Sequence, residues 1–185
     1  LEFRRVLFRS KFRKNRTDRV TRLAAAIESL CDRDLAQVEE TERIEALRLT
    51  GAQDLHAACK TFVDEVNSKL SHSFLALSPD VFAVAGFHED FANMVQINLR
   101  GRLLQIEYHA TDELYSTDDF RTPYILKGSV RAFNQELLDN NRVDEQMLFY
   151  CPKGDSGSWH FLDCRTYRTG PVDSEYLTKA IERLI

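Results

Sequence analysis

The chain has 185 residues, of which 43% are hydrophobic, and a formal net charge of −4 at pH 7. This length predicts one domain with a sizeable core, and the mild negative charge disfavours nucleic acid, whose phosphates require clustered Lys and Arg. No apolar run approaches the roughly 20 residues that cross a membrane. The four cysteines are scattered, which predicts reduced thiols in a cytoplasmic protein.

The first ten residues, LEFRRVLFRS, resemble the translated end of a short-read sequencing adapter. We interpret Leu1–Ser10 as an artefact of an assembled environmental read and exclude this segment from the fold analysis. Because no Met opens the chain, we expect the sequence to be the C-terminal part of a larger bacterial protein.

A long helical pattern follows and continues to Gly51. Apolar residues recur every three to four positions from Val20 onwards, which predicts a helix of about 30 residues. We expect residues 11–50 to form a helical arm that pairs with itself or binds a protein partner, although the heptad is too irregular for a strict coiled coil. The alternatives are a helix that lies along the sheet, or one that breaks near Arg33-Asp34. The residues assigned to the arm's interaction are Arg16, Arg19, Val20, Leu23, Ile27 and Leu30.

The start of this arm carries a local excess of positive charge. Residues 11–22 contain six Lys and Arg against one Asp. Nucleic acid or an acidic membrane surface would attract such a cluster, but Phe12 is its one aromatic residue, and positive charge opposes the dipole at a helix N-terminus. We therefore expect either that this segment continues upstream in the intact protein or that it pairs with an acidic segment elsewhere. Thr111–Asp119 is such a segment, in the same chain or in a second copy.

A second amphipathic helix is predicted from Leu55 to Leu70, with an apolar face wide enough to cover a sheet. Two short apolar runs then flank the turn signal Ser78-Pro79-Asp80. These runs, Phe74–Leu77 and Val81–Phe87, are interpreted as an additional hairpin at the sheet edge.

The best-defined part of the predicted sheet is a hairpin that turns at Arg100-Gly101. Folding residues 94–99 back onto residues 102–109 places Ile97 opposite Leu104. Because side chains alternate along a strand, a shift of one residue would scatter the apolar set over both faces. The sequence therefore constrains the register of this hairpin strongly.

The other face of the hairpin is polar, and it is either a solvated outer face or a binding surface. His109 and Asp112 have the residue types of a general base with its orienting carboxylate, but no nucleophile motif accompanies them. We therefore identify no catalytic residues. The candidate ligand- or partner-binding residues are Gln96, Asn98, Gln105, Glu107, His109 and Arg131.

After an acidic connection of residues 111–123, Tyr124–Phe133 predicts a third strand, and residues 135–141 allow one helical turn. Met147–Pro152 and Trp159–Cys164 predict a second hairpin closed by a six-residue turn. A last helix is expected after an Asp173 cap.

A zinc site is conceivable in the second hairpin, since Cys151, His160 and Cys164 have the residue types of zinc ligands. The six-residue turn places Cys151 opposite Trp159, on the face away from His160, so the three side chains cannot converge. We expect no metal and no cofactor.

The order of elements predicts an α+β fold. We expect an antiparallel meander sheet of five to seven strands, flanked by two N-terminal helices, one of them long, and by a C-terminal helix. Residues 51–185 would form this domain. The expected function is that of a non-enzymatic interaction or assembly module. The alternative is a small-molecule-binding domain or an enzyme with a site at the helix–sheet rim, near Glu107 and His109.

Overall fold

The computed structural model describes the backbone of residues 2–133 and 144–185, and the side chains of residues 18–111, 114–133 and 145–185. Contacts along the backbone divide the chain into two compact units, Leu1–Arg43 and Ile44–Ile185, and each is described by itself. Among the described residues, no helix combines the length and apolar character of a membrane span.

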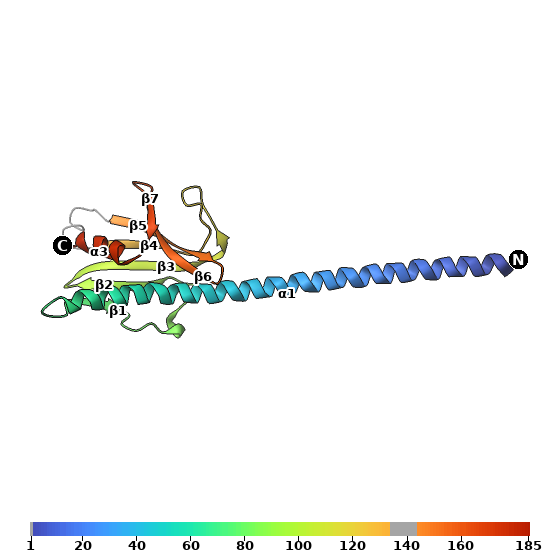
Figure 1. Ribbon diagram of the computed structural model, residues 1–185, viewed down its shortest axis with the longest axis horizontal. Helices are drawn as coiled ribbons and strands as arrows, with labels where there is room; N and C mark the ends of the chain where they lie inside the picture. The colour runs from blue at the N-terminus through green and yellow to red at the C-terminus, as the bar shows by residue number, and fades with distance from the viewer. Residues whose placement is uncertain (1, 134–143) are drawn as a thin grey trace. The chain divides into compact units, whose positions relative to one another are not determined.

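In the part of the chain that the structure describes, seven strands form one antiparallel sheet in which each strand pairs with its neighbours in sequence. This meander, with a long N-terminal helix and a C-terminal helix, confirms the predicted α+β class (Figure 1). The elements are α1 (Glu2–Ser68), β1 (Leu75–Ser78), the 3-10 helix η1 (Val84–Gly86), β2 (Asn93–Leu99), β3 (Arg102–Tyr115), β4 (Tyr124–Phe133), β5 (Asp144–Lys153), β6 (Ser156–Asp163), β7 (Arg168–Pro171) and α3 (Ser174–Glu182).

The predicted register of the central hairpin is confirmed, because Ile97 of β2 lies opposite Leu104 of β3. Arg100 and Gly101 have φ angles of 51° and 94°, which are typical of a type I′ turn. This turn has the backbone twist that suits two directly connected strands. Strand β4 also has the predicted bounds, Tyr124–Phe133.

The expectation of two N-terminal helices separated at Gly51 is wrong, because α1 is one continuous helix to Ser68. Gly51 lies where this helix approaches the sheet closely. A Cβ atom at this position would lie 2.8 Å from the Tyr150 ring, and the backbone oxygen of Gly51 accepts a hydrogen bond from Trp159. The glycine therefore permits close packing instead of ending the helix.

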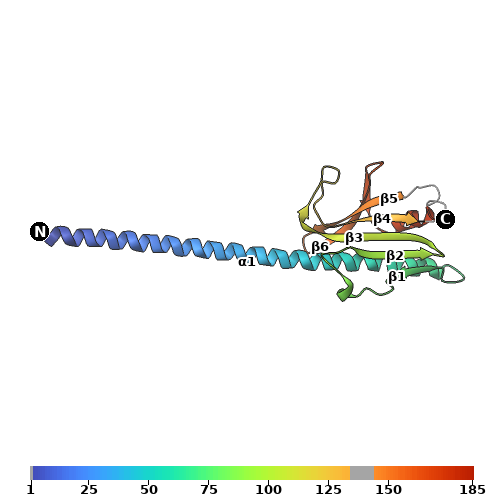
Figure 2. The same ribbon diagram turned by 180° about the vertical axis from the view of Figure 1, so that it is seen from behind.

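Within Ile44–Ile185, both helices pack on the same face of the sheet (Figures 1 and 2). The packed part of α1 begins near Leu47, which is buried, and its buried residues continue to Val63. Helix α3 adds four buried residues and begins as predicted, since the carboxylate of Asp173 accepts a 2.9 Å hydrogen bond from the Tyr176 backbone N–H.

The first edge of the sheet differs in part from its prediction. Strand β1 pairs with β2, but the second expected strand, Val81–Phe87, contains the 3-10 helix η1 instead. Strand β3 also continues to Tyr115, so the connection to β4 is shorter than expected. The predicted helical turn at residues 135–141 lies outside the described residues.

The register predicted for the second hairpin is wrong. Strands β5 and β6 are joined by a tight turn at Gly154-Asp155, which pairs Tyr150 with Trp159 and Cys151 with Ser158. The tight turn places the two aromatic rings side by side against the helices, with centroids 5.5 Å apart. Cys151 and His160 consequently lie on the same face of the sheet, whereas the predicted register placed them on opposite faces.

Candidate functional site

In the unit Leu1–Arg43, apolar side chains follow one side of helix α1. Among the described side chains of this unit, those of residues 18–43, six large ones are 51–62% exposed. At about 100° per residue, all of them fall within an arc of roughly 140°. We call this surface the apolar stripe, and it consists of Val20, Leu23, Ile27, Leu30, Cys31, Leu35 and Val38.

The residues predicted from the sequence to make the arm's contacts are four apolar residues and two arginines. The four apolar residues all belong to the apolar stripe, and the structure adds Leu35 and Val38 to the exposed set. Arg19 is exposed on the same helix, whereas the side chain of Arg16 is outside the described residues. The period of the apolar residues was the signal that could locate this surface.

The polar face of the sheet brings most of its predicted site residues together. The Gln96 side chain donates a 3.2 Å hydrogen bond to Gln105. The guanidinium of Arg131 lies 2.9 Å from Glu145 and 3.9 Å from Glu107. Because these groups bind one another and are partly exposed, they contribute about 0–1 kcal/mol per ion pair and require no ligand.

Two of the predicted residues do not join this cluster. Asn98 accepts a 2.9 Å hydrogen bond from the Gly101 backbone N–H, so its side chain supports the hairpin turn. His109 is exposed and lies opposite Lys127 on β4. The predicted cluster therefore corresponds to a hydrogen-bonded glutamine pair, an ion-pair group around Arg131, one turn residue and one exposed imidazole.

A small second core covers the neighbouring part of that face. Phe120, from the connection between β3 and β4, stacks on Phe149 with centroids 4.2 Å apart. Tyr124, Cys151 and Leu162 complete this buried cluster. Burial raises the pKa of the Cys151 thiol to about 11, so at neutral pH this cysteine is a protonated packing residue.

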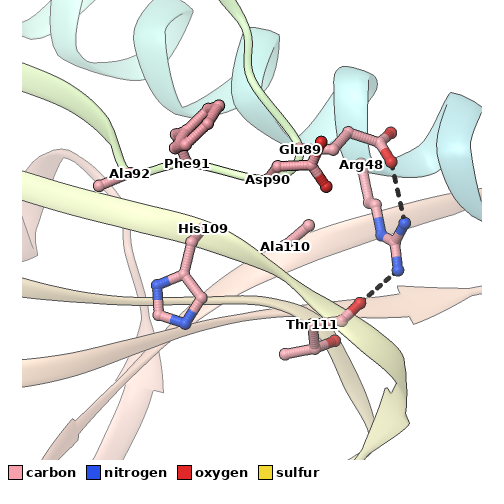
Figure 3. Close-up of a pocket in the computed structure, with 8 residues that line it drawn as sticks. All are labelled: Arg48, Glu89, Asp90, Phe91, Ala92, His109, Ala110 and Thr111. Carbon is pink, nitrogen blue, oxygen red and sulfur yellow. Dashed lines mark hydrogen bonds and ion pairs between the residues drawn. The ribbon is translucent and has the colours of Figure 1, made fainter.

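A pocket of about 490 Å³ lies where α1, the segment before β2 and the end of β3 meet (Figure 3). Arg48 is 8% exposed and donates to the Glu89 carboxylate at 3.1 Å and to the backbone oxygen of Thr111. Thr111 lies beyond the last β2–β3 pair, Asn93 with Tyr108. Arg48 therefore links helix α1 by a hydrogen bond to the part of β3 that does not pair with β2.

The sequence pointed to His109, which lines this pocket, but missed Arg48 and Glu89. A signal for Arg48 was present, because it falls in helical period with Ile44, Ala52 and Leu55 on the face that packs on the sheet. The described residues contain no group of three or more His, Cys, Asp or Glu side chains that could hold a metal ion.

The sequence analysis also missed a serine–imidazole pair, because the predicted strand began at Trp159 and left Ser158 in the turn. The Ser158 hydroxyl lies 2.9 Å from Nε2 of His160, and burial lowers the pKa of this histidine. A nucleophile and its base also need an orienting group and an oxyanion site. Residues two apart on any strand share a face, so this pair carries no catalytic assignment.

Comparison of the chain with protein-family models, with curated proteins and with solved structures finds no match. The function therefore has to be inferred from the surfaces described above. The sheet face and the Arg48 pocket hold polar groups that bind one another, whereas the apolar stripe consists of exposed carbon surface.

Proposed function

We propose that the protein is a non-enzymatic interaction and assembly module whose helical arm, predicted as residues 11–50, binds another helix through the apolar stripe, which precedes the part of α1 that packs on the sheet from Leu47. One observation carries this proposal: six large apolar side chains on one side of α1 are each more than half exposed. Single exposed apolar residues are ordinary, but a contiguous apolar surface is typical of a protein–protein interface.

The energetic reason is that a helix gains most of its stability from packing its apolar side. Complete burial of a Val, Leu or Ile side chain contributes about 1.5–3 kcal/mol. Covering the remaining exposed surface of six such residues is therefore worth several kcal/mol before the entropic cost of association. A second helix is the natural cover, because side chains three and four residues apart form ridges that fit between those of another helix.

The test is the solution mass of the full chain by light scattering, with far-UV circular dichroism as a check of folding. The double variant Leu23→Asp/Ile27→Asp places two charges in the apolar stripe and should convert an assembled wild type into a monomer. Ala25→Asp/Ala36→Asp is the matched control, since both alanines are exposed on the opposite side of α1. A monomeric wild type would rule out self-association through the stripe.

A second candidate function is small-molecule binding at the helix–sheet rim. The observation in its favour is the pocket of about 490 Å³, where Asp90, Glu89 and His109 lie beside apolar Phe91 and Ala110. Because Arg48 already binds Glu89, the Asp90 carboxylate beside the Phe91 ring is the group that suits a small primary amine. A thermal-shift screen of such amines should raise the melting temperature of the wild type, and Asp90→Asn should abolish that increase.

A further inference from the structure

Six of the seven residues of the apolar stripe are spaced symmetrically along helix α1. With Leu30 left out, its members follow from Val20 at intervals of three, four, four, four and three residues, and this order is the same from either end. The members that give these intervals are Val20, Leu23, Ile27, Cys31, Leu35 and Val38.

The centre of this pattern is Ser29. If a second copy is laid alongside in the opposite direction about Ser29, Val20 lies opposite Val38 of the second copy, Leu23 opposite Leu35, and Ile27 opposite Cys31. Each of these layers then contains two apolar side chains, as in antiparallel helix pairs, whereas Leu30 lies opposite Glu28. The same face of a second copy therefore places an apolar side chain opposite six of the seven residues of the stripe.

Charge favours this direction over the parallel one. Residues 11–22 contain six positive charges and one negative, whereas residues 36–47 contain four negative charges and one positive. Antiparallel pairing about Ser29 places the first segment of one copy beside the second segment of the other. Parallel pairing would place positive beside positive and negative beside negative, which opposes association.

We propose that the apolar stripe binds a second copy of this chain as an antiparallel helix pair centred on Ser29. This inference rests on the proposed assembly function and names its partner. Arg19 lies level with Glu39 of the second copy, and Arg16 lies level with Glu42. The acidic segment Thr111–Asp119 is then not required as the partner of the basic residues.

Disulfide trapping of the full chain tests the orientation. Val20→Cys and Val38→Cys are made separately with Cys31→Ser and Cys164→Ser, which remove the exposed native thiols; Cys59 and Cys151 are buried. In the antiparallel pair, position 20 lies about 27 Å from its own counterpart, at 1.5 Å per residue. A disulfide requires Cα atoms within about 7 Å, so neither variant alone can cross-link.

The expected result is a covalent dimer when the two variants are mixed, unfolded, refolded together and oxidised, and no covalent dimer from either variant alone. Cross-linking of Val20→Cys with itself would overturn the antiparallel orientation but leave the assembly function intact. A dimer by light scattering without any cross-link would overturn pairing through the stripe. A monomer by light scattering would overturn the inference together with self-association.

A charge exchange gives a second readout that does not depend on thiols. Arg16→Glu/Arg19→Glu should weaken dimerisation at least tenfold at low salt, and so should Glu39→Arg/Glu42→Arg. Mixing the two variants should give a heterodimer with about the wild-type affinity, because each acidic segment then lies beside a basic segment of the other copy. Failure of the mixture to recover would contradict the antiparallel register.

Discussion

The indole Nε1 of Trp159 donates a 2.7 Å hydrogen bond to the backbone oxygen of Gly51, which joins residues 108 positions apart in the sequence. The same glycine lies against the ring of Tyr150, whose side chain is fully buried. Helix α1 therefore meets strands β5 and β6 at a point that combines a buried hydrogen bond with a close backbone approach.

Gly51→Ala should destabilise the fold although alanine is the better helix former. The added Cβ would lie 2.8–2.9 Å from three ring atoms of Tyr150, closer than carbon atoms tolerate. Overpacking costs about 1–3 kcal/mol and the gain in helix propensity is about 1 kcal/mol, so the net loss should reach about 2 kcal/mol at most. Urea unfolding measures this loss. Exposed Gln53→Ala, on the same helix, should change stability by less than about 0.5 kcal/mol.

Trp159→Phe should lower the free energy of unfolding by about 2 kcal/mol. The change removes the hydrogen bond to Gly51 and leaves a buried carbonyl group with one partner fewer, in addition to the lost ring volume. Thermal and urea unfolding measure the effect. Tyr167→Phe is the control because Tyr167 is 68% exposed, and equal stability losses in both variants would contradict the structural role of the indole.

Arg48→Met should destabilise the protein by about 2–3 kcal/mol, since it removes a charged donor from both Glu89 and the Thr111 backbone. Hydrogen exchange in residues 88–93 should rise with it, because Glu89 loses its tie to α1. Lys60→Met provides the comparison. Its ion pair with Asp80 is solvent-exposed and should be worth only about 0–1 kcal/mol.

The protein should lose stability above about pH 9, in part because of Cys59. Burial raises the pKa of this thiol to about 12, whereas an exposed thiol ionises near 8.5. The folded state therefore holds the proton more tightly, so this contribution is complete below about pH 8.5 and is lost as pH rises towards 12.

The slope of this loss can reach about 1.4 kcal/mol per pH unit for one group. Urea unfolding of the wild type and of Cys59→Ala at pH 7.5, 9 and 10 measures it. The variant should be less stable at pH 7.5 and should show a shallower decline. Cys164→Ala should keep the wild-type slope because Cys164 is exposed. Equal slopes in all three proteins would contradict this assignment.

Features that depend on neighbouring residues could be predicted from the sequence. The register of the β2–β3 hairpin follows from alternation around a two-residue turn, and Ile97 does lie opposite Leu104. The bounds of β4 and the Asp173 cap follow from equally local patterns. The exposed residues of the apolar stripe were located by helical period alone.

Tertiary packing decided the features that depend on residues far apart. A glycine in a helical pattern is compatible with a helix end or with a close approach, and only the rings of Tyr150 and Trp159 select the second. The register of β5 and β6 followed from the length of a turn that local chemistry left open.

The candidate pocket shows the same division. The sequence predicts His109 as a candidate residue from its position on a strand. The role of Arg48 depends on the tertiary fold, because its buried guanidinium donates to Glu89 and to the Thr111 backbone, which are distant in sequence. The sequence by itself therefore determined the α+β class, the central register and the apolar stripe, because these depend on periodicities along the chain. Only the tertiary structure decided how helix and sheet fit together, because that fit depends on volumes and hydrogen bonds between distant residues.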